Sequence, residues 1–162
     1  MISELFTANV ILGILASGIR LATPYLYAAI GETFGQRSGV LNLGVEGQML
    51  LGAFAGFYVT FNTGSPWLGL LAAILAGALM GLIMGLISVT LHAEQGISGI
   101  GVYLFGLGMS DLLFQKTIGS VETVKGFQPI HIPWLSDLPV VGEVFFQHNI
   151  LVYFAFLLVP VS

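Results

Sequence analysis

The chain contains no cysteine and very little charge. Only 7% of its 162 residues are charged, four Lys or Arg and eight Asp or Glu, whereas about a quarter of the residues in soluble domains are charged. The lack of cysteine excludes disulfides, thiolate catalysis and Cys-ligated metal. The lack of charge excludes a water-soluble globule, because a soluble surface needs far more polar side chains. Four scattered basic residues also argue against nucleic-acid binding.

Long apolar segments take up most of the sequence. Hydrophobic residues make up 56% of the chain, and the mean hydropathy is +0.97. Four runs approach the roughly 20 residues needed to cross about 30 Å of hydrocarbon: residues 5–30, 38–61, 67–91 and 97–114. A fifth run, from near Asn149 to Ser162, would give only roughly 21 Å of helix. The pattern predicts an all-α, polytopic transmembrane helical bundle with about four complete spans and a truncated fifth.

Residues 115–148 form a polar connector between the fourth and fifth runs. The connector contains two lysines, Trp134 and three prolines, at Pro129, Pro133 and Pro139. Prolines at such spacing are typical of irregular chain outside the membrane, and tryptophan is enriched at the membrane interface. We therefore expect one transmembrane domain over residues 1–162, with 115–148 as an extramembrane loop that contains one short interfacial helix.

Small residues occur in two of the predicted spans. Gly39, Gly44 and Gly47 interrupt the second span, which is typical of a discontinuous helix whose freed backbone groups line a transport site. The third span has small residues four positions apart on one helical face, so another helix can approach closely there. This helix-packing set is Ala73, Gly77, Gly81 and Gly85.

Polar side chains at membrane depth are the candidates for function. Glu46 lies near the centre of the predicted second span, and Asn42 precedes it by one helical turn. An acidic residue at mid-membrane costs about 2.5 to 3.5 kcal/mol on insertion scales, so it should face other helices or water. The two residues either line a solute path or brace the bundle through hydrogen bonds, and the sequence leaves both interpretations open. The fourth span carries Asp111 near its end.

Catalytic and cofactor motifs are weak or incomplete. Gly96-Ile97-Ser98-Gly99 is similar to the nucleophile segment of rhomboid-type intramembrane serine proteases, but Ser98 would need a histidine base from another helix. A serine hydrolase using Ser98 remains one alternative function, and a membrane scaffold associating through the third-span glycines is another. His92-Ala93-Glu94 lacks the cysteine pair of a deaminase zinc site, and Lys116-Thr117 lacks the upstream glycines of a P-loop. We expect no metal and no cofactor.

One segment carries a long resemblance. The stretch GETFGQRSGVLNLGVEGQMLLGAF, from Gly31 to Phe54, together with GSPWLG and AEQGISGIGVYLFGLG, resembles permease subunits of bacterial ABC importers in the branched-chain amino acid, ribose and nucleoside group. The likeness is closest to nucleoside and simple-sugar permeases. The matching positions are Gly31, Glu32, Arg37, Ser38, Gly39, Asn42, Gly44, Glu46 and Gly47.

The resemblance implies a transporter subunit and not an enzyme. Such a permease pairs with a second permease, two cytoplasmic ATPase subunits and an extracytoplasmic solute-binding protein, and it lies in the bacterial cytoplasmic membrane. The loop that contacts the ATPase follows the fifth span, so we expect this chain to be the N-terminal part of a longer protein. The connector 115–148 then lies outside and the turn at 31–37 inside. The candidate path-lining residues are Asn42, Glu46, Gln48, Gln95 and Ser98.

Overall fold

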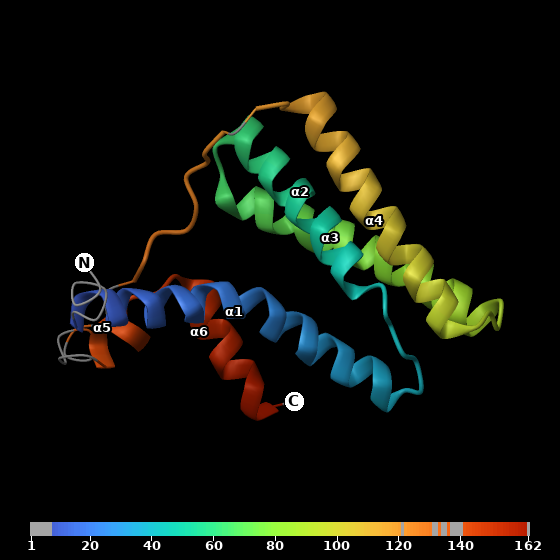
Figure 1. The fold of residues 1–162 in the computed structure, drawn as a ribbon, viewed down its shortest axis with the longest axis horizontal. Coiled ribbons are helices and arrows are strands. Elements are labelled where there is room, and N and C mark those ends of the chain that lie inside the picture. Colours follow the sequence, from blue (N-terminus) through green and yellow to red (C-terminus); the bar gives the residue numbers. More distant parts are fainter. Residues whose placement is uncertain (1–7, 121, 131–132, 134–135, 137–140, 162) are drawn as a thin grey trace. The chain divides into compact units, whose positions relative to one another are not determined.

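The computed structural model describes residues 8–120, 122–130, 133, 136 and 141–161, and over these residues it is helical with no strand (Figure 1). The all-helical prediction is therefore confirmed. The helices are α1 (Ala8–Arg37), α2 (Val45–Thr63), α3 (Pro66–Gly85), the π-helical turn η1 (Leu86–Thr90), α4 (Gln95–Thr117), α5 (Val141–Phe145), α6 (Ile150–Leu158) and the 3₁₀ turn η2 (Val159–Val161).

Within the described residues, three helical segments are long and apolar enough to cross a membrane. These are Val10–Arg37, Pro66–Thr90 and Gln95–Thr117, which correspond to the first, third and fourth predicted spans. The third is the most apolar, and it runs through α3 into η1 without a break. The second predicted span forms α2, a 19-residue helix. At the C-terminal end, the short fifth run forms α6 and η2.

The second predicted span begins later than its hydropathy suggests. Helix α1 continues to Arg37, and α2 starts only at Val45, so residues 38–44 form a non-helical connection, called the junction loop below. Gly39 has a φ of +85°, a conformation that glycine adopts without steric cost. The break predicted from the glycines thus lies at Gly39 and Gly44, whereas Gly47 lies within α2.

The chain divides into two units, residues 32–126 and residues 1–31 with 127–162. In the first unit, α2 packs against both α3 and α4 (Figure 1). Its buried core contains Met80 and Met84 from α3 and Val102 from α4, with Leu51 of α2 against them. Helix α2 ends at Gly64, in the left-handed conformation, and Pro66 opens α3 at a position where its missing N–H costs nothing.

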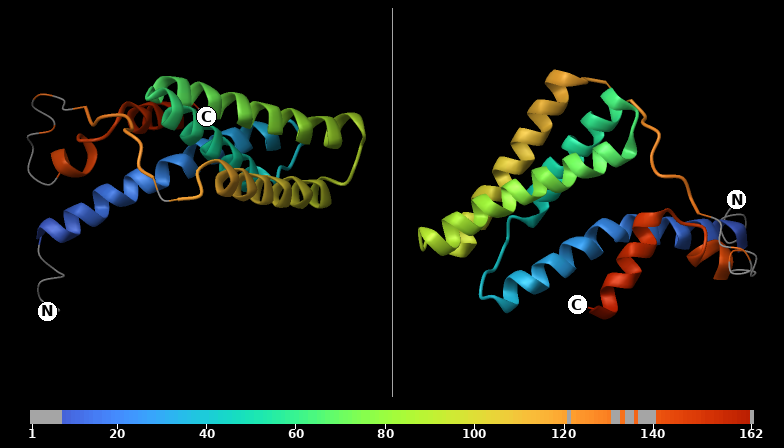
Figure 2. Two further views of the ribbon diagram at one scale, coloured as in Figure 1. Left: turned by 90° about the horizontal axis from the view of Figure 1, so that it is seen from above. Right: turned by 180° about the vertical axis from the view of Figure 1, so that it is seen from behind.

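The second unit contains the α1 residues 8–31 together with α5 and α6. Figure 2 shows α6, in red, beginning beside α1, in blue. The Tyr27 hydroxyl of α1 donates a hydrogen bond of 2.6 Å to the carbonyl oxygen of Leu151 in α6, and its ring stacks on Phe154 at 6.5 Å between centroids. The Asn149 side chain caps α6 by accepting from the Val152 N–H.

The predicted connector 115–148 is only partly described. Helix α4 continues into it as far as Thr117, and the five-residue helix α5 lies near its other end. Trp134 and Pro139, which are part of the basis for this prediction, lie outside the described residues. Whether the connector is outside the membrane stays a prediction.

Candidate functional site

The junction loop is held by the side chain of Asn42. The Oδ1 atom of Asn42 accepts a hydrogen bond from the Gly44 N–H at 3.0 Å, and its Nδ2 donates to Oε1 of Gln48 at 3.1 Å. Its backbone N–H donates to Oε1 of Glu32, on α1, at 3.0 Å. A side-chain oxygen that accepts from the backbone two residues on is the Asx-turn geometry, which competes with helix. Asn42 therefore ends the interruption and links α1 to the start of α2.

Gln95 ties the same loop to α4. Its Oε1 accepts a hydrogen bond of 2.8 Å from the Leu41 N–H, and its Nε2 donates one of 3.2 Å to the Gly39 carbonyl oxygen. Both bonds join residues more than 50 positions apart in the chain. The amide of Gln95 thus forms hydrogen bonds with two backbone groups that have no helical partner at the break. Non-helical backbone near a membrane needs such partners, because water is scarce there.

Glycines allow α2 and α4 to touch along their backbones. A Cβ atom added at Gly47 would lie 2.7 Å from the Cα of Tyr103, and one at Gly44 would lie 2.7 Å from Cγ1 of Val102. Gly106 of α4 faces the backbone of Gly47 itself. No side chain fits at such distances. Gly44 therefore combines its place at the break with a packing role, whereas Gly47, which lies within α2, has the packing role instead of the predicted helix-break role.

The structure brings together three of the five candidate path residues. Asn42, Gln48 and Gln95 meet around the junction loop, joined by Glu32, and we call these four residues the junction network. The Nε2 atom of Gln48 is buried and has no hydrogen-bond partner among the residues that the structure describes. Glu32 belongs to the motif that carries the resemblance, but it is not among the candidate path-lining residues. Its position in the matching motif was the only signal for it.

Glu46 and Ser98 lie apart from this network. The prediction that Glu46 lies near the centre of a span is wrong, because the second helix starts only at Val45. Glu46 is exposed in the first turn of α2, where a carboxylate interacts favourably with the positive end of the helix dipole. The Ser98 hydroxyl donates to the Glu94 carbonyl oxygen at 2.6 Å. That bond to the preceding turn accounts for the serine without a catalytic partner, and the hydrolase alternative gains no support.

Glu94 is the N-cap of α4. Its carboxylate accepts from the Ile97 N–H at 2.5 Å and from the Gly96 N–H at 2.9 Å. These two backbone bonds, Ile97 first, hold the pKa of Glu94 below its ordinary value, since they stabilise the ionised form. The carboxylate thereby fixes the start of α4, one residue before Gln95.

The small-residue stripe of α3 is used at one end. Ala73 lies beside Gly56 of α2, whose added Cβ would be 3.3 Å from the Ala73 Cβ. Added Cβ atoms at Gly77, Gly81 and Gly85 would meet nothing within 4 Å in the described part of the chain. Packing at those three glycines stays a prediction.

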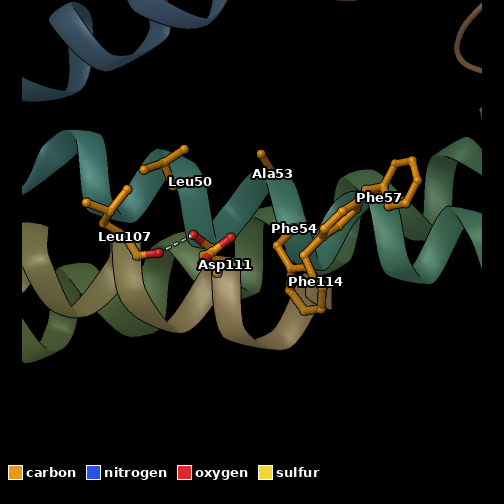
Figure 3. Close-up of a pocket in the computed structure, with 8 residues that line it drawn as sticks. Leu50, Ala53, Phe54, Phe57, Leu107, Asp111 and Phe114 are labelled. Atoms are coloured by element: carbon orange, nitrogen blue, oxygen red, sulfur yellow. Dashed lines mark hydrogen bonds between the residues drawn. The ribbon is translucent and has the colours of Figure 1, made fainter. Parts of the chain in front are cut away.

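A groove lies between α2 and α4, away from the junction loop (Figure 3). Its volume is about 400 Å³, and one side is open. The lining is apolar and aromatic apart from Ser110 and Asp111, and it consists of Leu50, Ala53, Phe54, Phe57, Leu107, Ser110, Asp111 and Phe114. The sequence showed Asp111, but only the crossing of the two helices reveals the aromatic rings beside it.

The described residues contain no group of three His, Asp or Glu side chains that could hold a metal ion. The candidate site therefore offers two kinds of chemistry. One is the amide and carboxylate hydrogen bonding of the junction network, and the other is the aromatic groove with its single carboxylate.

Comparison with known proteins covers nearly the whole chain. Residues 14–161 match the family described as branched-chain amino acid transport system / permease component. The putative glucose ABC transporter permease protein TsgC13 of Haloferax volcanii is 39% identical over 153 residues, 92% of this chain and 46% of that protein. No solved structure matches the chain significantly.

Two further relatives are named for nucleosides. The guanosine ABC transporter permease protein NupQ of Bacillus subtilis is 36% identical, over 78% of this chain and 42% of that protein. The nucleoside ABC transporter permease protein NupC of Lactococcus lactis subsp. cremoris is 30% identical, over 91% of this chain and 49% of that protein. The chain spans less than half the length of each of these relatives.

Proposed function

We propose that this chain forms part of the transmembrane permease of an ABC importer for a nucleoside or simple sugar. The reason is its family, because the chain belongs to the branched-chain amino acid transport system permease components. In this proposal the solute moves inward by alternating access. ATPase subunits supply the energy, since no P-loop motif occurs in the sequence. The partners are a second permease subunit, two cytoplasmic ATPase subunits and an extracytoplasmic solute-binding protein, in the bacterial cytoplasmic membrane.

The observation that carries the proposal is the similarity to permeases named for glucose, guanosine and nucleosides, which extends over 78% to 92% of this chain. The three apolar helices that can cross a membrane agree with a permease. Choosing between sugar and nucleoside on the relatives' names alone is an argument by analogy, because the same fold serves several solutes.

The junction network gives this part of the permease a rigid core. Gln95 fixes the junction loop to α4, and the close approach of Gly47 to Tyr103 and of Gly106 to Gly47 holds α2 against α4. Packed elements of this kind move as one body, while access changes at the hinges around them. We therefore assign Asn42, Gln48 and Gln95 a bracing role next to the path.

Glu46 keeps the path-lining role. It is exposed, it lies one turn from the junction loop, and no hydrogen bond occupies its carboxylate in the described structure. Its place at the start of α2, beside the junction loop, supports this proposal, because an exposed carboxylate in an apolar bundle is expected to face water or a polar partner. Ser98 is a weaker candidate for lining the solute path, because its hydroxyl donates a hydrogen bond to the Glu94 carbonyl oxygen at the start of its own helix.

Uptake by whole cells tests the proposal. A strain lacking the gene and the same strain carrying the intact gene are compared for uptake of radiolabelled guanosine and radiolabelled glucose. We expect the intact gene to restore uptake of one of these solutes at least tenfold. Equal uptake of both solutes by the two strains would overturn the proposal. A variant of the ATPase subunit with its P-loop lysine replaced serves as the control for energy coupling.

A further inference from the structure

The groove between α2 and α4 contains a carboxylate at a depth where carboxylates are rare. Asp111 lies six residues before the end of the apolar segment Gln95–Thr117, which corresponds to about 9 Å along the helix. Its side chain is exposed, and its polar partner among the described residues is the neutral Gln115, whose Nε2 donates at 2.8 Å. An ionisable group in a span faces a water-filled cavity or a polar ligand, because lipid cannot solvate it.

Aromatic faces lie next to this carboxylate. Phe54 and Phe57 come from α2 and Phe114 from α4, and Figure 3 shows Asp111 between Leu107 and the Phe54–Phe114 pair. The Phe57 and Phe114 rings lie 6.1 Å apart at an angle of 53°. Aromatic rings of this kind give a planar ligand apolar faces and edges to pack against.

The combination of flat apolar surface and one carboxylate selects a class of solute. Aromatic side chains stack on every kind of nucleobase, because each base has a π-face. An acidic side chain accepts hydrogen bonds from ribose hydroxyls, as it does in dinucleotide-binding folds. No lining residue carries positive charge, so a phosphorylated nucleotide would meet only the like charge of Asp111. The groove has a volume of about 400 Å³ and is largely open, so it would cover one side of a nucleoside and leave the other side exposed.

The geometry points to this groove as a nucleoside-binding section of the solute path, with the base against Phe54, Phe57 and Phe114 and the ribose hydroxyls on Asp111. This inference rests on the proposed function and narrows it from sugar or nucleoside to nucleoside. It leaves the junction network, whose amides are engaged with each other and with the loop, in its bracing role.

Cysteine accessibility tests the inference directly, since the chain has no cysteine of its own. The test variant is Ala53→Cys, because Ala53 is exposed in the groove on α2. The matched control is Ala78→Cys, because Ala78 is exposed on α3 outside the groove. Each variant, assembled with its transporter partners in membranes, is treated with a cationic, membrane-impermeant methanethiosulfonate. Labelling of this chain is then followed by mass.

We expect Ala53→Cys to be labelled, and guanosine to slow that labelling at least fivefold while glucose slows it less. Guanosine should not change the labelling of Ala78→Cys. Adding Asp111→Asn to Ala53→Cys should remove the protection by guanosine, and adding Asp111→Glu, which keeps the carboxylate, should retain it. Continued labelling of the introduced thiol in both double variants shows that the groove is still formed.

Two results would overturn the inference. If Ala53→Cys is not labelled, another helix or lipid covers the groove; if it is labelled without protection by guanosine, the groove is wet but does not bind nucleoside. Parallel uptake measurements separate these failures from failure of the proposed function. If the wild type takes up guanosine or glucose but guanosine does not protect the Ala53→Cys thiol, only the inference about the groove fails. If the wild type takes up neither solute, the proposed importer function fails as well.

Discussion

At the residue scale, a few polar side chains replace the backbone hydrogen bonds that the break between α1 and α2 removes. Gln95 alone satisfies the Leu41 N–H and the Gly39 carbonyl oxygen. Asn42 satisfies the Gly44 N–H, and Glu32 satisfies the N–H of Asn42. The junction loop therefore depends on the side chains of Gln95, Asn42 and Glu32, which come from different parts of the sequence.

Removing the Gln95 amide should loosen the junction loop. In Gln95→Ala two hydrogen bonds are lost, each worth about 0.5–1.5 kcal/mol in net stability. Amide hydrogen exchange at Leu41 should then accelerate about tenfold, which corresponds to about 1.4 kcal/mol. The control is Asn62→Ala, which removes an amide bonded only to Tyr58 on its own helix. Unchanged exchange at Leu41 in Gln95→Ala would show that the loop does not need the Gln95 bonds.

The N-cap of α4 should respond to acid. Backbone donors lower the pKa of Glu94 in the folded protein below its ordinary value of 4.5. The stabilisation is therefore fully present above the unfolded pKa and disappears as the pH falls through the lower, folded pKa. Protection of the Gly96 and Ile97 amides against hydrogen exchange should fall over that acidic range in the wild type.

Glu94→Gln provides the comparison. This variant should have lower protection at Gly96 and Ile97 at neutral pH and no acid transition there, because the side chain no longer ionises. Glu122→Gln, which changes an exposed carboxylate outside α4, should keep the wild-type transition. If the acid transition persists in Glu94→Gln, it belongs to another ionisable group.

At the element scale, hydropathy predicted the spans well where a run is apolar throughout, as at Pro66–Thr90. It placed the start of the second span at Ser38, seven residues before the Val45 start of α2. The error has a physical cause, because residues such as Val40, Leu41 and Leu43 are apolar but lie in a loop held by Gln95 from another helix. No local pattern contains that tertiary contact. The groove at Asp111 escaped prediction for the same reason, since it exists only where α2 crosses α4.

The contact between α2 and α4 should tolerate no side chain at Gly106. The residue faces the backbone of Gly47, so Gly106→Ala forces the helices apart, and overpacking of this kind costs about 1–3 kcal/mol. Gly108 lies two residues away on α4 with nothing within 4 Å of an added Cβ. Gly108→Ala should therefore be neutral or stabilise the helix by up to about 1 kcal/mol. Thermal unfolding in detergent measures both, and equal midpoints for the two variants would contradict the close packing.

At the scale of the whole molecule, composition predicted a membrane protein, and the motif from Gly31 to Phe54 predicted the permease family. Both predictions are confirmed. The orientation has less support, because the sequence offers little charge from which to infer the topology. Arg37 lies on the side expected inside, against Lys116 and Lys125 on the side expected outside.

Topology can be measured because the chain has no cysteine. Lys125→Cys should react with an impermeant maleimide in intact cells, since the resemblance implies that the connector is outside. Arg37→Cys should react only after the membrane is permeabilised, because the resemblance implies that the turn at 31–37, where α1 ends, is inside. Reversed labelling of the two variants would invert the orientation and leave the family assignment unaffected.

The most direct test of the importer is solute uptake by the reconstituted transporter. Proteoliposomes contain the permease, the second permease and the ATPase subunits, with binding protein and solute on one side and ATP on the other. We predict uptake of guanosine that requires ATP and that stops when the ATPase subunits are omitted. Absence of ATP-dependent uptake of both guanosine and glucose from a fully assembled complex would contradict the assignment of this chain to a nucleoside or sugar importer.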